Sequence, residues 1–372
     1  MMARRLALAS VFVCACLASA AAETVPATTA STPAPEAPAA QAPATPSPTV
    51  KAPAAQTPAP AEKSDKPAMP NLPQPATTVS PGPLPSADGL DPARFGARPA
   101  DEAYGAYQRG LYKTAYNLAL PRAQNGDPAA QTLLAEILSR GLGVPANAAE
   151  AAKWYSAAAE RGIPEAQFQY ALMLLDGRFV TKDEKQAYAL MQAAAEAGNP
   201  LAQFNFAQLL VKEDSGDAGL TRAVSYYERA ADAGVADAQY AMSQIYANGA
   251  GGKAQNDTQA LLFLARAARQ NYDTAQLDLG EWLIEGRGGK RDLKAGFSWM
   301  LAAANGGNVA AQNRLAKLYM GGIGTEPDSI LAGAWYIVAR RAGLIDSEME
   351  DFMHGLTDDE TKKALQRANR LP

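Results

Sequence analysis

The feature that most constrains the fold of this chain is a period of about 36 residues. The dipeptide Ala-Gln recurs with its glutamine at positions 131, 167, 203, 239, 276 and 312, in steps of 36, 36, 36, 37 and 36. A second landmark, a pair of aromatic or large apolar residues, keeps the same spacing from Trp154-Tyr155 to Trp335-Tyr336. Such a fixed period indicates an array of stacked units rather than several independent domains.

The first part of each unit has the pattern of an amphipathic α-helix. In the third copy Ala202, Phe206 and Leu210 are spaced by four residues, which places them on one helical face. Asn199-Pro200 supplies a helix cap followed by proline at the first helical position, where a missing N–H costs nothing. One position is always small and predicts close approach of a second helix: Ala135, Ala171, Ala207, Ser243, Gly280 and Ala316.

The second part of each unit predicts another helix. It opens at a residue that commonly caps helices: Asn147, Asp183, Asn256, Asp292 or Asp328. The stretches "NAAE" and "DEKQ" have the spacing of a capping box. Glycine-bearing turns such as "GLGVPA" and "GGIGTE" separate the two parts. Each unit is therefore helix, turn, helix, and stacked units bury one continuous core.

The pattern "KWYSAAAERGIPEAQFQYALMLLDGR" resembles the Sel-one-like repeat (SLR) family, relatives of the tetratricopeptide repeats. The resemblance implies an all-α fold, a right-handed superhelical α-solenoid of about six to seven helix-turn-helix repeats, acting as an adaptor for other proteins. It covers residues 101–345, and residues 346–372 read as a polar C-terminal helical cap. The third copy departs from the pattern, with "KEDSGDAG" in place of the turn glycines, and residues 101–126 look more like an ordinary tetratricopeptide unit.

Residues 1–22 have the pattern of a secretory signal peptide. Arg4 and Arg5 precede an apolar run of about a dozen residues, shorter than the ~20 that a membrane-spanning helix needs. Cleavage after Ala20 or Ala22 fits the small residues there and would remove both cysteines of the chain. The alternative is a lipoprotein site in which Cys16 is acylated and anchors the protein. A bacterial, exported and most simply periplasmic protein is expected, with secreted or membrane-anchored forms as alternatives.

Residues 23–100 are rich in proline, alanine and threonine, and 19 of the 26 prolines of the chain lie there. Few of these residues are large and apolar, so the segment cannot bury enough surface to offset its backbone entropy. We expect a disordered linker, either a passive spacer or a ligand for a proline-recognising module.

Composition and motifs argue against several kinds of chemistry. The net charge is −4 and no Lys/Arg-rich run occurs, so no nucleic-acid binding is expected. The lone histidine, His354, cannot build a His-rich metal site, nor a nucleophilic triad without a cysteine or a suitably placed serine and acid, and no metal or other cofactor is expected. Two Gly-Gly-Lys turns, at Lys253 and Lys290, lack the Ser or Thr of a phosphate loop and any preceding strand. We therefore expect no catalytic residues.

Two rows of residues on the first helices are the candidate binding surface. The aromatic row follows each repeat alanine by two residues: Thr132, Phe168, Phe204, Tyr240, Leu277 and Asn313. The amide row lies four residues further on: Glu136, Leu172, Gln208, Gln244, Glu281 and Lys317. If the helices stack as in tetratricopeptide arrays, both rows face a concave groove, and Phe168, Phe204, Tyr240, Gln208, Gln244 and Glu281 bind a protein or peptide. In the alternative, the rings pack between neighbouring helix pairs.

The expected function is an exported, non-catalytic interaction scaffold or regulator of the bacterial cell envelope. A carbohydrate- or peptidoglycan-associated enzyme subunit and a secreted host-interaction factor are the alternatives. The enzyme alternative requires two carboxylates that converge in the groove.

Overall fold

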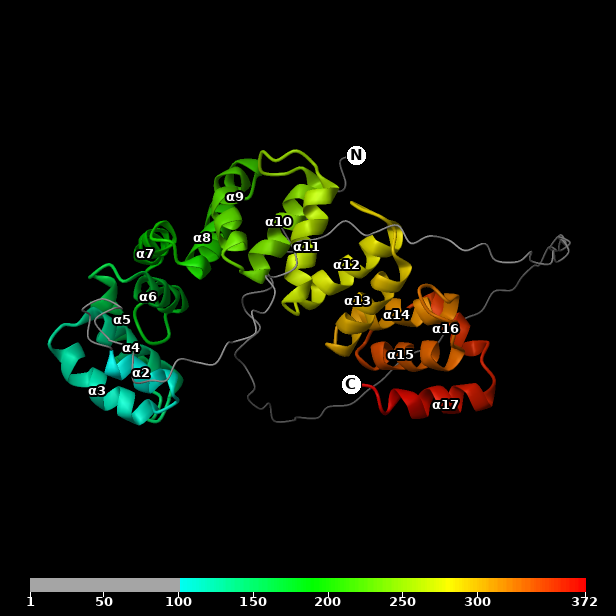
Figure 1. Cartoon of the computed structure of the whole chain (residues 1–372), viewed down its shortest axis with the longest axis horizontal. Coiled ribbons are helices and arrows are strands. Elements are labelled where there is room, and N and C mark those ends of the chain that lie inside the picture. The colour runs from blue at the N-terminus through cyan, green and yellow to red at the C-terminus, as the bar shows by residue number, and fades with distance from the viewer. Residues whose placement is uncertain (1–100) are drawn as a thin grey trace, which may run out of the picture. The chain divides into compact units, whose positions relative to one another are not determined.

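The computed structural model describes residues 101–372, which form 16 α-helices and no strand (Figure 1). Consecutive helices pack against one another throughout residues 102–341, so the predicted all-α array of helix pairs is confirmed. The predicted signal peptide, the predicted Pro/Ala-rich linker and the alternative lipidation site at Cys16 lie outside the described residues. Among the helices that are described, none combines the length and the apolar composition that a membrane span requires.

Six first helices carry the repeated Ala-Gln dipeptide. They are α4 (Pro128–Arg140), α6 (Pro164–Asp176), α8 (Pro200–Glu213), α10 (Ala236–Asn248), α12 (Asp273–Glu285) and α14 (Val309–Gly321). The predicted cap at Asn199 is present, since its Oδ1 accepts from the Ala202 N–H at 2.8 Å, and Pro200 occupies the first turn. Proline there loses no hydrogen bond because the first helical N–H groups have no partner within the helix.

Six second helices alternate with them: α5 (Ala148–Ala159), α7 (Glu184–Glu196), α9 (Asp217–Asp232), α11 (Asp257–Arg269), α13 (Leu293–Asn305) and α15 (Ser329–Arg341). The five predicted caps all accept a backbone N–H: Asn147, Asp183, Asn256, Asp292 and Asp328. The capping-box spacing is only half realised at Asn147, whose amide donates to the Glu150 carboxylate at 3.0 Å. A reciprocal box closes instead at Thr357 and Glu360.

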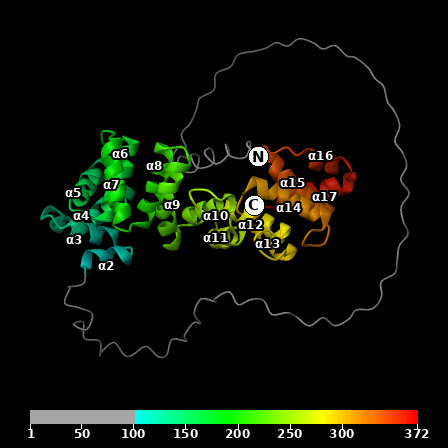
Figure 2. The same ribbon diagram turned by 90° about the horizontal axis from the view of Figure 1, so that it is seen from above.

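A further pair stands at each end of the six repeats. The pair α2 (Glu102–Gln108) and α3 (Tyr112–Gln124) precedes α4, and α16 (Ser347–His354) and α17 (Asp358–Ala368) follow α15. The helix α3 packs against α4, and α17 packs against α15. Figure 2 shows the same succession of helices from above. The polar C-terminal segment therefore folds as two helices that each contact α15 of the last repeat.

The turns within the first, fourth, fifth and sixth repeats use two glycines for two reasons. The first, such as Gly322, ends the first helix with a left-handed φ of 63°, which side chains rarely adopt. The second, such as Gly324, lies against the beginning of the preceding repeat's second helix, where an added Cβ would lie 2.1 Å from the Leu293 carbonyl oxygen. The turn therefore requires glycine both for backbone conformation and for packing between repeats.

The small position of each first helix lies at the contact with its second helix. At Gly280 an added Cβ would lie 3.0 Å from the Gly296 carbonyl oxygen of α13, so these two backbones approach closely. The equivalent Ala135, Ala171, Ala207 and Ala316 have no exposed surface. Close packing of the two helices of a repeat thus follows from the size of one residue.

The third repeat keeps the period but changes the turn. Its helices α8 and α9 are 14 and 16 residues long, against 12 or 13 in the other repeats. Only Asp214–Gly216 separates them, with no left-handed glycine at the end of α8. The predicted departure in "KEDSGDAG" is therefore a short connection between two extended helices.

Candidate functional site

The phenylalanines of the aromatic row lie in the core. Phe168 and Phe204 are 4% and 8% exposed, and both belong to the apolar cluster of the second, third and fourth repeats. The Phe204 ring packs against Tyr227 of α9 with 5.8 Å between ring centroids. Both rings therefore pack between helices, as in the alternative given by the sequence. Partner binding through these two rings stays a prediction.

Tyr240 links the fourth repeat to the fifth. Its hydroxyl donates to Asp278 Oδ2 at 2.9 Å, and its ring stacks on Tyr272 at 5.1 Å. Burial raises the pKa of the Tyr240 phenol, and the neighbouring Asp278 charge raises it further. The hydrogen bond therefore keeps its direction, from the tyrosine to the carboxylate.

Asp278 is the most perturbed carboxylate on the first helices. Burial raises its pKa to about 6, Glu281 adds to the rise, and the hydrogen bond from Tyr240 opposes it. Gln244 Nε2 lies 3.5 Å from the same Oδ2. Glu281 is paired with Arg314 Nε at 2.9 Å. The two carboxylates are thus each held by side chains of another repeat, an arrangement that serves contact between repeats.

The amide row remains accessible. All six of its residues are half-buried, in contrast to the buried phenylalanines. Four residues further along each helix lies an exposed row: Arg140, Asp176, Lys212, Asn248, Glu285 and Gly321. Because residues four apart share a helical face, the two rows form one surface, which we call the first-helix face. The sequence analysis missed the exposed row, although the same spacing could have identified it.

Ion pairs occupy both ends of the first-helix face. At one end Glu136 accepts from the Tyr155 hydroxyl at 2.9 Å and pairs with Arg140 at 2.9 Å. At the other end Lys317 Nζ lies 2.8 Å from Asp346 and 2.7 Å from Glu348. Hydrogen bonds and charge from Lys317 lower the pKa of Asp346 to about 2. These contacts fix the orientation of the polar side chains at both ends of the face.

The middle of the face carries uncharged amides. Gln208 and Gln244 belong to consecutive repeats, with Lys212 and Asn248 exposed beside them. Amides offer both donors and acceptors, which suits hydrogen bonding to a peptide backbone. The middle of the face thus combines hydrogen-bonding capacity with access to solvent.

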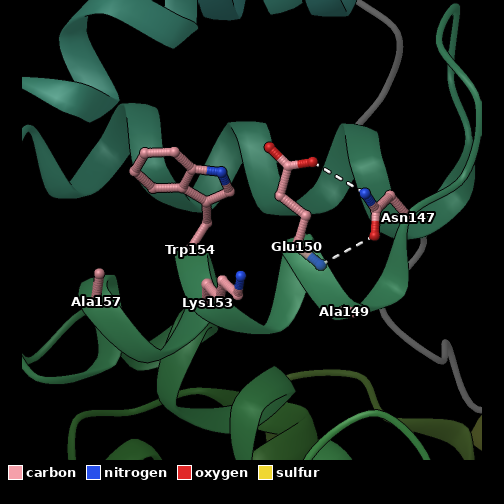
Figure 3. Close-up of a pocket in the computed structure, with 6 residues that line it drawn as sticks. All are labelled: Asn147, Ala149, Glu150, Lys153, Trp154 and Ala157. Atoms are coloured by element: carbon pink, nitrogen blue, oxygen red, sulfur yellow. Dashed lines mark hydrogen bonds between the residues drawn. The ribbon is translucent and has the colours of Figure 1, made fainter.

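A shallow pocket lies on α5, away from the predicted site residues. It is lined by Asn147, Ala149, Glu150, Lys153, Trp154 and Ala157, all from one helix and its cap (Figure 3). The Glu150 carboxylate accepts from the Asn147 side-chain amide, and the Glu150 backbone N–H donates to Asn147 Oδ1. Helix capping therefore accounts for the arrangement of these two residues. The lining has one carboxylate and one lysine, and no second helix contributes a side chain to it.

No metal-binding constellation is found among residues 101–372. No group of three or more His, Cys, Asp and Glu side chains there could hold a metal ion. His354 lies in the last turn of α16. Lys253, in one Gly-Gly-Lys turn, pairs with Glu228 at 2.7 Å, and Gly251 of the same turn packs on Val224 and Leu220. This glycine-rich turn therefore serves contact between repeats.

Comparison with protein families identifies the repeat. The Sel1 repeat model matches residues 128–163, 164–199, 201–235, 236–272, 274–308 and 309–344. The matched ranges cover α4 to α15, and the pairs α2–α3 and α16–α17 lie outside them.

Two solved structures resemble the chain. A Sel1 repeat protein from Oxalobacter formigenes is 26% identical, with a TM-score of 0.56 over 67% of this chain and 100% of that one. A protective antigen of uropathogenic Escherichia coli with an SLR fold is 28% identical, with a TM-score of 0.49 over 69% of this chain and 63% of that one. A search of curated proteins finds no significant match.

Proposed function

The chain belongs to the Sel1 repeat family, and from this premise we propose that it is a non-catalytic scaffold that binds a protein or peptide partner along its first-helix face. The observation that carries the proposal is the accessibility of two adjacent, mostly polar rows over six consecutive repeats, beside the buried Phe168 and Phe204. A repeat array holds such rows at regular spacing, which suits an elongated partner.

The chemistry of the face indicates how it binds. Its central amides can hydrogen-bond the main chain of a partner, whereas Leu172 in the second repeat supplies an apolar contact beside them. Charged residues flank this centre, with Glu281 and Glu285 in the fifth repeat and Arg140 in the first. Such a face favours a partner that makes polar main-chain contacts at the centre.

A site-specific photocrosslinker tests the proposal. A benzophenone amino acid replaces Gln244 on the first-helix face or, as the matched control, the exposed Gln259 on the second helix α11. We expect one partner to be captured from envelope fractions at position 244 and not at 259. The variant Gln208→Ala with Lys212→Glu should then weaken binding of the identified partner while leaving helical content unchanged. Equal capture at both positions would refute the assignment of the face.

We further propose export to the bacterial cell envelope, most simply to the periplasm. The support is the arginine pair, apolar run and small residues within positions 1–22. Fractionation followed by the mass of the mature N-terminus tests it. Cleavage after Ala20 or Ala22 is expected, a lipidated Cys16 would show anchoring instead, and an intact Met1 in the cytoplasmic fraction would refute export.

Asp278 and Glu281 are the observation that favours the alternative, a carbohydrate-associated enzyme. A carboxyl group of raised pKa close to a second carboxylate is the arrangement of glycoside hydrolases. Here, however, Tyr240 and Arg314 occupy these two acids. Digestion assays on peptidoglycan with the unmodified chain and Asp278→Asn decide the point, and we expect no turnover by either protein.

A further inference from the structure

The first described helix, α2, has an outer face that stays exposed among residues 101–372. Its buried side consists of Ala103 and Ala106, and the helix packs against α3. The opposite side carries Tyr104, which is 52% exposed, and Gln108, which is also exposed. Figure 2 shows α2 at the edge of the array. A large aromatic side chain is therefore left in solvent at this end of the repeats.

Tyr104 is the most exposed of three neighbouring rings. It stacks on Tyr107 with 6.3 Å between ring centroids, and Tyr112 meets Tyr107 edge-on at 5.5 Å. Arg140 Nη1 of α4 lies 3.5 Å from the Tyr107 hydroxyl. Contacts with α3 and α4 thus support the ring group, so little side-chain ordering remains when a partner packs on it.

Exposed apolar side chains are concentrated on the pair α2–α3. Among residues 101–372, eight large apolar side chains are exposed, and three of them belong to this pair and its turn: Tyr104, Leu111 and Leu118. The helix at the other end, α17, has the mostly charged sequence DDETKKALQRA. A local concentration of exposed apolar side chains marks an interaction surface, so the N-terminal end is the better candidate for one.

The charges of α2 are arranged symmetrically about its middle. Glu102 and Arg109 are seven residues apart, about two helical turns, so they occupy the same edge of the helix. Neither takes part in an ion pair within residues 101–372. Gly105 lies near the midpoint, and a Cβ added there would touch no side chain other than that of Arg109, at 3.9 Å. A second helix can therefore approach the middle of α2 closely.

We propose that α2 is the contact between two copies of this chain, which pack with their α2 helices antiparallel across a twofold axis. Such an axis pairs residues that lie at equal distances on either side of the 105–106 peptide bond. Glu102 of one copy then faces Arg109 of the partner subunit, and its own Arg109 faces the partner's Glu102. Tyr104 faces Tyr107 of the partner subunit and is buried by the contact.

The charges also select this arrangement over the parallel one. A twofold axis along the helices would bring each Glu102 to the partner's Glu102 and each Arg109 to the partner's Arg109, so like charges would repel at both ends. The antiparallel contact instead joins two pairs of opposite charge. It is independent of the partner proposed for the first-helix face.

Sedimentation velocity of the full chain tests the association. A contact built on one short helix from each copy is small, so we expect a weak dimer with a dissociation constant on the order of 10–100 µM. The sedimentation coefficient should rise from that of a monomer to that of a dimer across this range and then stop. A chain that stays monomeric well above this range would overturn the proposal and leave the α2 face to a different partner.

Charge reversal tests the antiparallel arrangement. Glu102→Arg or Arg109→Glu places like charges at both contacts, so either change should raise the dissociation constant about tenfold or more, with an unchanged circular dichroism spectrum. The matched control is Arg269→Glu, at an exposed arginine of α11, which should leave the dissociation constant unchanged.

Mixing the two reversed proteins supplies the decisive result. In an equimolar mixture of the Glu102→Arg and Arg109→Glu proteins, every contact of a mixed dimer again joins opposite charges. We therefore expect the mixture to dimerise as the parent chain does, although each variant alone does not. A mixture that stays monomeric, or single variants that dimerise as tightly as the parent, would overturn the proposal.

Discussion

The side chain of Gln203 donates through Nε2 to the carbonyl oxygen of Ala195, eight residues earlier, at 3.2 Å. The last carbonyls of a helix have no partner within it, and this glutamine satisfies one of them across the turn between repeats. The same bond recurs at Gln131, Gln167, Gln239, Gln276 and Gln312, with distances from 3.0 to 3.4 Å. The period of Ala-Gln in the sequence is thus a period of helix ends tied to the next helix.

Replacing Gln203 by leucine should therefore destabilise the array. Leucine has a side chain of similar size but cannot donate to the Ala195 carbonyl, which then keeps only the Gly198 N–H at 3.2 Å, so the expected cost is about 0.5–1.5 kcal/mol. Urea denaturation followed by circular dichroism measures the loss. Gln192→Leu is the control, because that amide bonds the Glu196 carboxylate in an exposed pair. Its effect should stay within about 0.5 kcal/mol, and equal losses would contradict the assigned role.

Gly324 and Gly307 separate two costs of adding a side chain. Both have left-handed φ angles, 74° and 91°, so alanine at either adds backbone strain of roughly 1–2 kcal/mol. Only at Gly324 would the new Cβ collide with Leu293; at Gly307 no atom lies within 4 Å. We expect Gly324→Ala to lower the free energy of unfolding clearly more than Gly307→Ala does in thermal or urea melts. Equal effects would mean that the turn at Gly324 can shift away from Leu293 without loss of packing.

Helix positions and caps could be read from the sequence because each depends on neighbours within about eight residues, and the small inter-helix residue could be read because it recurs at one position of every repeat. Asn199, for example, caps a helix through the N–H group of Ala202, three residues away. The fate of Phe204 could not be read in this way. An apolar residue at that position suits a groove or a core equally well, and the choice depends on Tyr227 in the following helix. The Tyr240–Asp278 bond joins residues 38 positions apart, beyond any local pattern.

Burial of Phe204 leads to a prediction opposite to that for an exposed groove anchor. Phe204→Ala should lower the free energy of unfolding by about 3–5 kcal/mol, because it removes a packed ring and leaves a cavity. Leu201→Ala, one turn earlier on the same helix and at a side chain 48% exposed, should change it by less than about 1 kcal/mol. Chemical denaturation of both variants gives the comparison. A Phe204→Ala protein as stable as the parent would restore the ring as a candidate surface anchor.

The burial of Asp278 should make stability depend on pH near 6. The pKa of Asp278 is about 6 in the folded chain, above the ~3.9 of an unfolded aspartate. Above pH 6 Asp278 is charged in both the folded and the unfolded state, and burial of this charge destabilises the folded state. As pH falls from 7 toward 4 the folded state takes up the proton first, so this group's contribution to stability rises.

The variant Asp278→Asn removes this titration while its amide oxygen can still accept from the Tyr240 hydroxyl. Relative to the parent, it should therefore gain stability as pH rises from 4 to 7. Tyr240→Phe should raise the pKa of Asp278, because the lost hydrogen bond favoured the charged carboxylate. Carbon-13 NMR titration of the carboxyl group would then show its midpoint moving above that of the parent. A midpoint that stays in place or falls would show that the phenol does not govern the charge of Asp278.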